Sequence, residues 1–247
     1  MALLTEEVVR QMSNGGTRGP VVVSRDDVLT PSARSWLREH RVEVVYPQGR
    51  AAEGETSAPA GDRARYQTLF GAALDHKPEH MTHLDAQVLV PKDHPRILFR
   101  GCVDSLEADL LLAQREAMDE GYQAICKDLG DALEFARQAL RRDVLNEPME
   151  AMRLGGLDPA ELRARSHTPQ KYYNQPHFMP DHTQSRALLA INRARTTARG
   201  AELACYRAFR DLNGLCTRED LLQGFNRLSS FLWILEIRLA SGQEKKG

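Results

Sequence analysis

The sequence predicts a mainly α-helical protein, a bundle of about five helices preceded by a small strand-helix-strand module. From about residue 97 onward, apolar residues recur over long segments with the 3.6-residue period of a helix, and clusters of β-branched residues are few. Before residue 47 the chain instead has short Val-rich runs on either side of a helical segment. A chain of 247 residues is long enough to form one bundle with such an appendage.

The small module is predicted within residues 1–46. It is expected to contain a short helix over 2–12, a strand over 20–23, a helix opened by Thr30-Pro31 and a strand over 42–46. Threonine is a common N-cap and proline fits the first helical turn, so this dipeptide marks a helix start. Residues 47–63 are rich in Pro, Gly, Ala and Glu without a hydrophobic period. We therefore expect a linker over 47–76 and the helical-bundle domain over 77–247.

Capping and breaking residues divide the bundle into separate helices. We expect helices over 99–120, 123–144, a short segment that begins at Asp158-Pro159, 183–213 and 217–240. Gly121 ends the first of these and Pro148 follows the second. The Pro-rich span 168–180 is predicted to be a loop. A capping box, Thr217-x-x-Asp220, is expected to open the last helix.

The charge balance argues against a nucleic-acid binder. Lys and Arg number 33 against 34 Asp and Glu, so the formal net charge is −1 and the basic field that nucleic acids attract is missing. Of the cations 27 are Arg, the side chain suited to bidentate phosphate contacts. A compositional bias toward Arg explains that count as well.

The sequence also lacks the features of a membrane or secreted protein. No segment has 18 uncharged apolar residues, and the opening MALLTEEVVRQ carries Glu6 and Glu7 where a signal peptide has a basic flank. The four cysteines are isolated, without a CxxC pair. We therefore expect a cytoplasmic protein with reduced thiols and no membrane partner.

A polar stripe marks the predicted helix 183–213. Arg195, Arg199 and Glu202 fall at i, i+4 and i+7 and therefore share one face. A solvated face with intrahelical ion pairs is the ordinary explanation. The last helix, however, carries Asn226 in an otherwise apolar seam, and a buried amide is costly without a partner. A ligand-lined cleft between the two helices is the alternative that we favour.

Two further polar groups precede the bundle. Lys92, Arg96 and Arg100 are candidates for phosphate contacts, and an ordinary charged loop explains them equally. His76, His80 and His83 have the spacing of zinc ligands on a helix. Pro78 lies between them and argues against that helix, so no metal site is predicted.

Three of these segments, in this order, resemble the propanediol-type ATP:corrinoid adenosyltransferases over roughly residues 77–240. They are Val90-Pro91-Lys92-Asp93-His94-Pro95-Arg96 with Gly101-x-Val103-Asp104-x-Leu106-x-Ala108, then Ala194-Arg195-Thr196-x-x-Arg199-x-Ala201-Glu202, then Asn226-Arg227-Leu228-Ser229. The N-terminal module with Leu29-Thr30-Pro31-Ser32-Ala33-Arg34, and the lead-in Lys77-Pro78-Glu79-x-x-Thr82-His83-Leu84, resemble the ethanolamine-utilization branch of that family.

The resemblance implies transfer of the 5′-deoxyadenosyl group of ATP to cob(I)alamin, with Mg²⁺, in a homotrimer of helical bundles. It implies that the adenosylcobalamin serves ethanolamine ammonia-lyase, that a reductase is a further partner, and that the protein works in or near a bacterial microcompartment. By position it assigns catalysis to Arg195, Arg199 and Glu202, with the same three residues binding ATP alongside Lys92, Asn226, Thr82 and His83. It pairs Asp104 with Arg195 across an interface, and implies that the corrinoid is bound without its lower axial ligand, which requires an apolar wall beneath it. Phe178 or Met179, in the loop before the arginine-bearing helix, is our candidate for that wall, and plain loop packing explains them equally.

Two departures from the family pattern leave a second function open. The Thr-Gly-Asp-x-Gly phosphate loop of the propanediol-type enzymes is missing, and Ser230 stands where many members have Asp. The alternative is a non-catalytic carrier of corrinoid or nucleotide, or a docking protein of the ethanolamine microcompartment.

Overall fold

The computed structural model describes residues 3–12, 21–23, 28–30, 33, 36–37, 40, 42, 44–45 and 65–244. The chain divides into two units, Met1–Gly61 and Asp62–Gly247. The finer division predicted above, at residues 46 and 76, stays a prediction, and most of the predicted linker lies outside the described residues. None of the helices in the described part of the chain is long and apolar enough to cross a lipid bilayer.

The first unit has short parallel strand pairs around a small core. β1 (Leu3–Leu4) pairs with β3 (Val28–Leu29), and β2 (Val21–Val22) pairs with β4 (Val44–Val45). Helix α1 spans Glu6–Met12, shorter than predicted because the chain before it is extended in β1. Thr30 Oγ1 accepts a hydrogen bond from Ala33 N (3.3 Å), as expected of the predicted N-cap. The buried side chains include Val9, Val21, Ala33, Trp36 and Leu37.

A four-stranded sheet that the sequence analysis missed precedes the bundle. Its strands are β5 (Tyr66–Thr68), β6 (Ala73–Leu74), β7 (Met81–Asp85) and β8 (Val88–Pro91), in the order β6-β5-β8-β7. β5 and β8 are parallel, and the other two pairs are antiparallel. Strands β5 and β6 lie in the range predicted as a linker. These strands are too short to show a clear alternation of apolar and polar residues, which explains why the sequence pattern did not reveal them.

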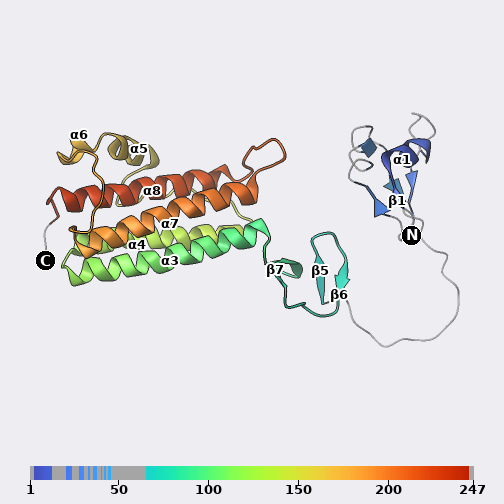
Figure 1. Ribbon diagram of the computed structural model, residues 1–247, viewed down its shortest axis with the longest axis horizontal. Helices are drawn as coiled ribbons and strands as arrows, with labels where there is room; N and C mark the ends of the chain where they lie inside the picture. Colours follow the sequence, from blue (N-terminus) through green and yellow to red (C-terminus); the bar gives the residue numbers. More distant parts are fainter. Residues whose placement is uncertain are drawn as a thin grey trace. The chain divides into compact units, whose positions relative to one another are not determined.

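The predicted helical bundle is confirmed (Figure 1). Its helices are α3 (Pro95–Asp119), α4 (Gln123–Val144), α5 (Pro159–His167), α6 (Pro169–Tyr173), α7 (Arg186–Phe209) and α8 (Glu219–Ala240). The four long helices lie side by side, with α3 packed on α4 and α7, and α7 packed on α8. The short helices α5 and α6 lie against α8.

The core of the bundle is aromatic at one end. Phe225 packs edge-to-face between Phe99 and Phe135, with ring centroids 5.6 and 5.3 Å away. Such pairs add roughly 0.5–1.5 kcal/mol beyond the area that they bury. Gly224 allows this close approach of α8 to α4, because a Cβ built there would lie 2.6 Å from the ring of Phe135.

Two local predictions were wrong. The span 168–180, expected to be a loop, contains α6, which ends at Asn174 in the left-handed conformation (φ 53°). The capping box at Thr217 does not form, because α8 starts one residue later with Arg218 as its N-cap. Asp220 instead accepts a hydrogen bond from Met149 N (2.7 Å), and Thr217 Oγ1 donates to Phe209 O (2.9 Å). Tertiary partners therefore replace the predicted local ones.

Candidate functional site

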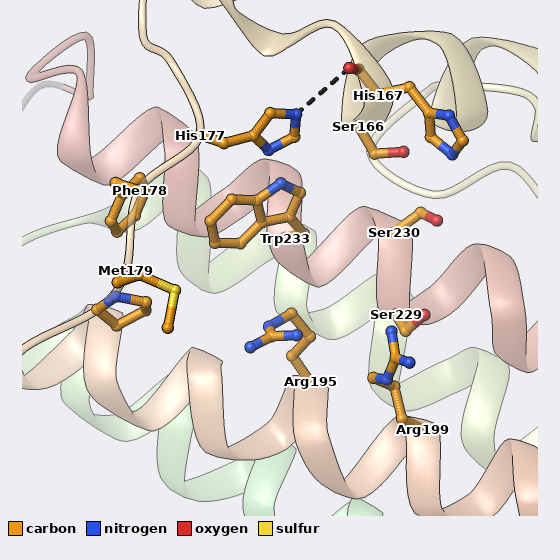
Figure 2. A pocket seen from close by; sticks show the side chains of 11 residues that line it. Ser166, His167, His177, Phe178, Met179, Arg195, Arg199, Ser229, Ser230 and Trp233 are labelled. Atoms are coloured by element: carbon orange, nitrogen blue, oxygen red, sulfur yellow. Dashed lines mark hydrogen bonds between the residues drawn. The ribbon is translucent and has the colours of Figure 1, made fainter.

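A pocket of about 400 Å³ lies between α7, α8 and the segment that leads from α5 to α7 (Figure 2). Its lining combines two cations, several hydroxyl groups and aromatic side chains: Ser166, His167, His177, Phe178, Met179, Pro180, Arg195, Arg199, Ser229, Ser230 and Trp233. The mixture suits a ligand that has both an anionic part and a flat apolar part.

The two helices present these side chains because their apolar residues occupy the opposite faces. On α7, Ile191, Ala194 and Ala198 are buried in the core, which turns Arg195 and Arg199 toward the pocket. Figure 2 shows both arginines rising from α7 toward Ser229, Ser230 and Trp233 on α8. The shared face predicted for Arg195 and Arg199 therefore lines one pocket.

Arg195 is held by three contacts. Its Nε donates to Glu236 Oε1 (2.9 Å) on α8, and its Nη2 donates to Asn192 Oδ1 (2.6 Å) one turn earlier on α7. The guanidinium carbon also lies 5.6 Å from the centre of the Trp233 ring, a cation–π arrangement. No described residue accepts a hydrogen bond from Nη1 of Arg195. One edge of the guanidinium is thus left for a ligand.

Arg199 lies one turn further along α7 and is exposed. It forms no ion pair or hydrogen bond with any residue in the described part of the chain. When no protein carboxylate pairs with an arginine that faces a pocket, all the N–H donors of its guanidinium group are available to an anion.

Trp233 is the pocket residue that the sequence analysis overlooked. Its ring stacks on Phe178 (centroids 5.1 Å apart) and on His177 (5.9 Å apart, 4° between planes). His177 Nε2 in turn lies 3.3 Å from the carbonyl oxygen of His167. The spacing offered a signal, because Trp233 follows Asn226 by seven residues and therefore shares its side of α8.

Glu202 and Asn226 line a second pocket, of about 760 Å³, next to the loop before α8. Asn226 Nδ2 donates to Glu202 Oε1 (2.8 Å), and Asn226 Oδ1 accepts from Arg227 Nη2 (2.6 Å). The partner predicted for Asn226 was a ligand, whereas in this chain protein side chains satisfy the amide. The predicted stripe therefore divides between two neighbouring pockets.

The other predicted residues lie outside both pockets. Thr82 and His83 are in β7, and Lys92 follows β8 with its Nζ 3.2 Å from Glu79 Oε1. Asp104 is exposed on α3, and Arg195 pairs with Glu236 within this chain. A contact between Asp104 and Arg195 of different subunits stays a prediction. The two corrinoid candidates do line the first pocket; Met179 is 87% exposed, whereas Phe178 is partly buried against the core.

Arg96 and Arg100, two of the three candidate phosphate contacts, form an internal ion cluster. Both pair with the fully buried Asp143 near the end of α4, at 2.8 and 2.6 Å. Arg96 also donates from Nη2 to the carbonyl oxygen of Asp143 (2.7 Å). The cluster joins the start of α3 to the end of α4, so these two cations serve the fold. Among the described residues, no three His, Cys, Asp or Glu side chains form a metal-binding group.

Glu236, next to the first pocket, is a buried carboxyl whose ionisation is unfavourable. Burial raises the pKa of its carboxyl from the ordinary 4.5 to about 7, although Arg195 acts to lower it. Between these two values the folded chain holds a proton that the unfolded chain has released, so stability falls as pH rises through this window. Across this pH window the free energy of unfolding falls by about 3 kcal/mol in total.

Replacing Glu236 by Gln is therefore expected to stabilise the protein at pH 8 and to change little at pH 5. The amide keeps the shape of the protonated carboxyl and cannot ionise, so it removes the cost of burying the charge. Thermal unfolding of both proteins at the two pH values measures the effect. A variant that is less stable than the wild type at pH 8 would show that the ionised pair stabilises the fold.

Comparison with known proteins shows the family of the chain. The family model for cobalamin adenosyltransferase matches residues 73–239. Two curated relatives, both called corrinoid adenosyltransferase EutT and from Salmonella typhimurium and Escherichia coli K12, are each 30% identical over 95% of this chain and 91% of their own length.

A solved structure shares the fold. It is a variant of a PduO-type ATP:corrinoid adenosyltransferase from Lactobacillus reuteri, in complex with cobalamin and ATP. The match has a TM-score of 0.53 at 16% identity, and covers 68% of this chain and 92% of that one. The family model and the EutT relatives together span the bundle and both of its pockets. The chain belongs to the cobalamin adenosyltransferase family, as an ATP:corrinoid adenosyltransferase of the EutT type.

Proposed function

We propose that the protein transfers the 5′-deoxyadenosyl group of ATP to cob(I)alamin, and that the adenosylcobalamin serves ethanolamine ammonia-lyase. The observation that carries the proposal is the first pocket, where Arg199 has no partner in the described part of the chain and Arg195 keeps one free edge beside an aromatic wall. Similarity to the EutT proteins supports the link to ethanolamine. Work in or near a microcompartment, with a reductase as partner, belongs to the same proposal.

In this reaction the Co(I) ion of the corrinoid is the nucleophile. Its electron pair forms a bond to the 5′ carbon of the ribose while the bond from that carbon to the triphosphate oxygen breaks, and the triphosphate leaves with the electron pair of the broken carbon–oxygen bond. Negative charge therefore builds on the leaving group, where fixed guanidinium groups stabilise it. Mg²⁺ is expected to enter with the triphosphate, because this ion keeps several waters and binds substrate phosphates.

We assign the triphosphate to Arg195 and Arg199, and the rest of the ATP to Glu202 and Asn226 in the adjoining pocket. Lys92, Thr82 and His83 do not line either pocket of their own chain. That placement supports a homotrimer in which a neighbouring subunit brings them to the ATP, with its Asp104 beside Arg195.

Phe178 is the better of the two corrinoid candidates. It stacks on Trp233 and so forms a fixed apolar surface, whereas Met179 is almost fully exposed. Such a surface favours a corrinoid without its lower axial ligand, the form in which Co(II) is easier to reduce.

Phe178→Ala is expected to slow turnover at least about tenfold when the reaction starts from cob(II)alamin and a weak reductant. It should change the rate much less when cob(I)alamin is supplied, because the difficult reduction is then bypassed. Met179→Ala is the matched control. Equal loss from both starting materials would show that Phe178 acts elsewhere in the reaction.

The direct test is the absorbance change on mixing the protein with ATP, Mg²⁺ and cob(I)alamin without oxygen. A product that accumulates over many turnovers and is destroyed by light supports the proposal. Saturable binding of both substrates without product would overturn it in favour of a carrier, and would direct attention to Ser230 and to the missing phosphate loop.

A further inference from the structure

Glu236, on the facing helix α8, holds Arg195 in place. Asn192 Oδ1 accepts from Nη2 of Arg195 within α7, and the Trp233 ring lies 5.6 Å from the guanidinium carbon. The bond from Nε to Glu236 Oε1 (2.9 Å) is the one hydrogen bond that ties the guanidinium to α8 among the described residues. The guanidinium is then fixed between α7 and α8, and its Nη1 has no hydrogen-bond partner among the described residues.

Glu236 is a costly choice for this position. Its side chain is fully buried, with 0% exposed, while the arginine that it meets is 23% exposed. Its second oxygen, Oε2, is buried without any hydrogen-bond partner in the described part of the chain. A buried carboxylate with an unsatisfied oxygen destabilises a fold, and an apolar or neutral side chain there would serve packing better.

The neighbours of Glu236 offer no structural reason for the charge. On α8 it is flanked by the buried Leu235 and Ile237. The cation nearest along the helix, Arg238, is already paired with Asp128 of α4 and with Glu244. Arg195 is therefore the one cation among the described residues with which Glu236 forms an ion pair.

We propose that Glu236 is a positioning residue of the adenosyltransferase reaction, which orients the Arg195 guanidinium on Trp233 so that its free edge meets the triphosphate. The inference rests on the proposed assignment of Arg195 to ATP. Glu236 itself touches no substrate and acts through Arg195. The negative charge of Glu236 strengthens its hydrogen bond to Arg195 Nε, since hydrogen bonds that involve ionised groups are about twice as strong as neutral ones.

The experiment is a double-mutant cycle in the full-length protein at pH 8, with Glu236→Gln, Arg195→Lys and the two combined. We expect Glu236→Gln to lower kcat/KM for ATP about tenfold while its melting temperature equals or exceeds that of the wild type. A purely structural role would move activity and stability in the same direction. In the Arg195→Lys background, Glu236→Gln should change kcat/KM less than twofold, because the guanidinium that it orients is gone. Glu134→Gln, on the exposed face of α4, is the matched control.

The outcomes distinguish the positioning role of Glu236 from the assignment of Arg195 to ATP. If Arg195→Lys leaves kcat/KM for ATP unchanged, Arg195 does not bind ATP and both statements fail. If Arg195→Lys lowers it while Glu236→Gln has no effect, or has the same effect in both backgrounds, only the positioning role is overturned.

Discussion

Replacing Arg199 by Ala is expected to lower kcat/KM for ATP by roughly 10²–10³-fold, the usual cost of removing one fixed donor from a developing negative charge. Arg199 faces the first pocket with no partner in the described part of the chain, so its entire hydrogen-bonding capacity is available to the triphosphate. Because Arg199 pairs with no carboxylate in the described part of the chain, its replacement leaves no buried carboxylate without a counter-charge. The melting temperature should consequently stay within a few degrees of the wild type.

The measurement is steady-state adenosylation at saturating cob(I)alamin with varied ATP. Arg207→Ala is the matched control, because Arg207 is an exposed arginine of the same helix that lines neither of the two pockets. Arg195→Ala should resemble Arg199→Ala in activity, and should also affect stability because it leaves Glu236 without its cation. Equal activity losses in Arg199→Ala and Arg207→Ala would place the ATP outside this pocket.

The largest expected effect on stability belongs to Asp143→Ala. Asp143 is fully buried and accepts bonds from Arg96 and Arg100, which are themselves only 16% exposed. Removing the shared carboxylate leaves two largely buried guanidinium groups without a counter-charge. Breaking a buried ion pair in this way costs about 3–5 kcal/mol. For a protein of this size the melting temperature should fall by roughly 10 °C.

Chemical denaturation, read as the change in the free energy of unfolding, measures this effect. The control is Asp119→Ala, which removes an i,i+4 ion pair with Arg115 on the surface of α3. Exposed pairs of this kind contribute at most about 1 kcal/mol. A comparable loss in the two variants would mean that the cluster at Asp143 is not the structural clamp that its burial indicates.

Local features of the fold followed from the sequence. Helix α4 begins and ends at the predicted residues, and α5 begins at Pro159 with Asp158 as its cap, as expected. These boundaries are set by capping groups and breakers within a few residues of the helix end, which a sequence displays directly. The shared face of Arg195 and Arg199 is likewise a consequence of helical periodicity alone.

The resemblance to a family was also visible in the sequence, because its motifs combine residue types at fixed spacing. The family is confirmed by the comparisons, whereas the roles assigned to single residues remain predictions.

The partners of the buried charges were decided only by the tertiary structure. Nothing near Arg195 in the sequence indicates that Glu236, on another helix, would bind it, or that Asp143 would take up Arg96 and Arg100. Trp233 became part of the site for the same reason, because only packing of α8 on α7 brings its ring to the arginine. Sequence periodicity determines which face of a helix is polar. Which polar groups meet across two helices depends on their packing and register, and that is a property of the folded chain as a whole.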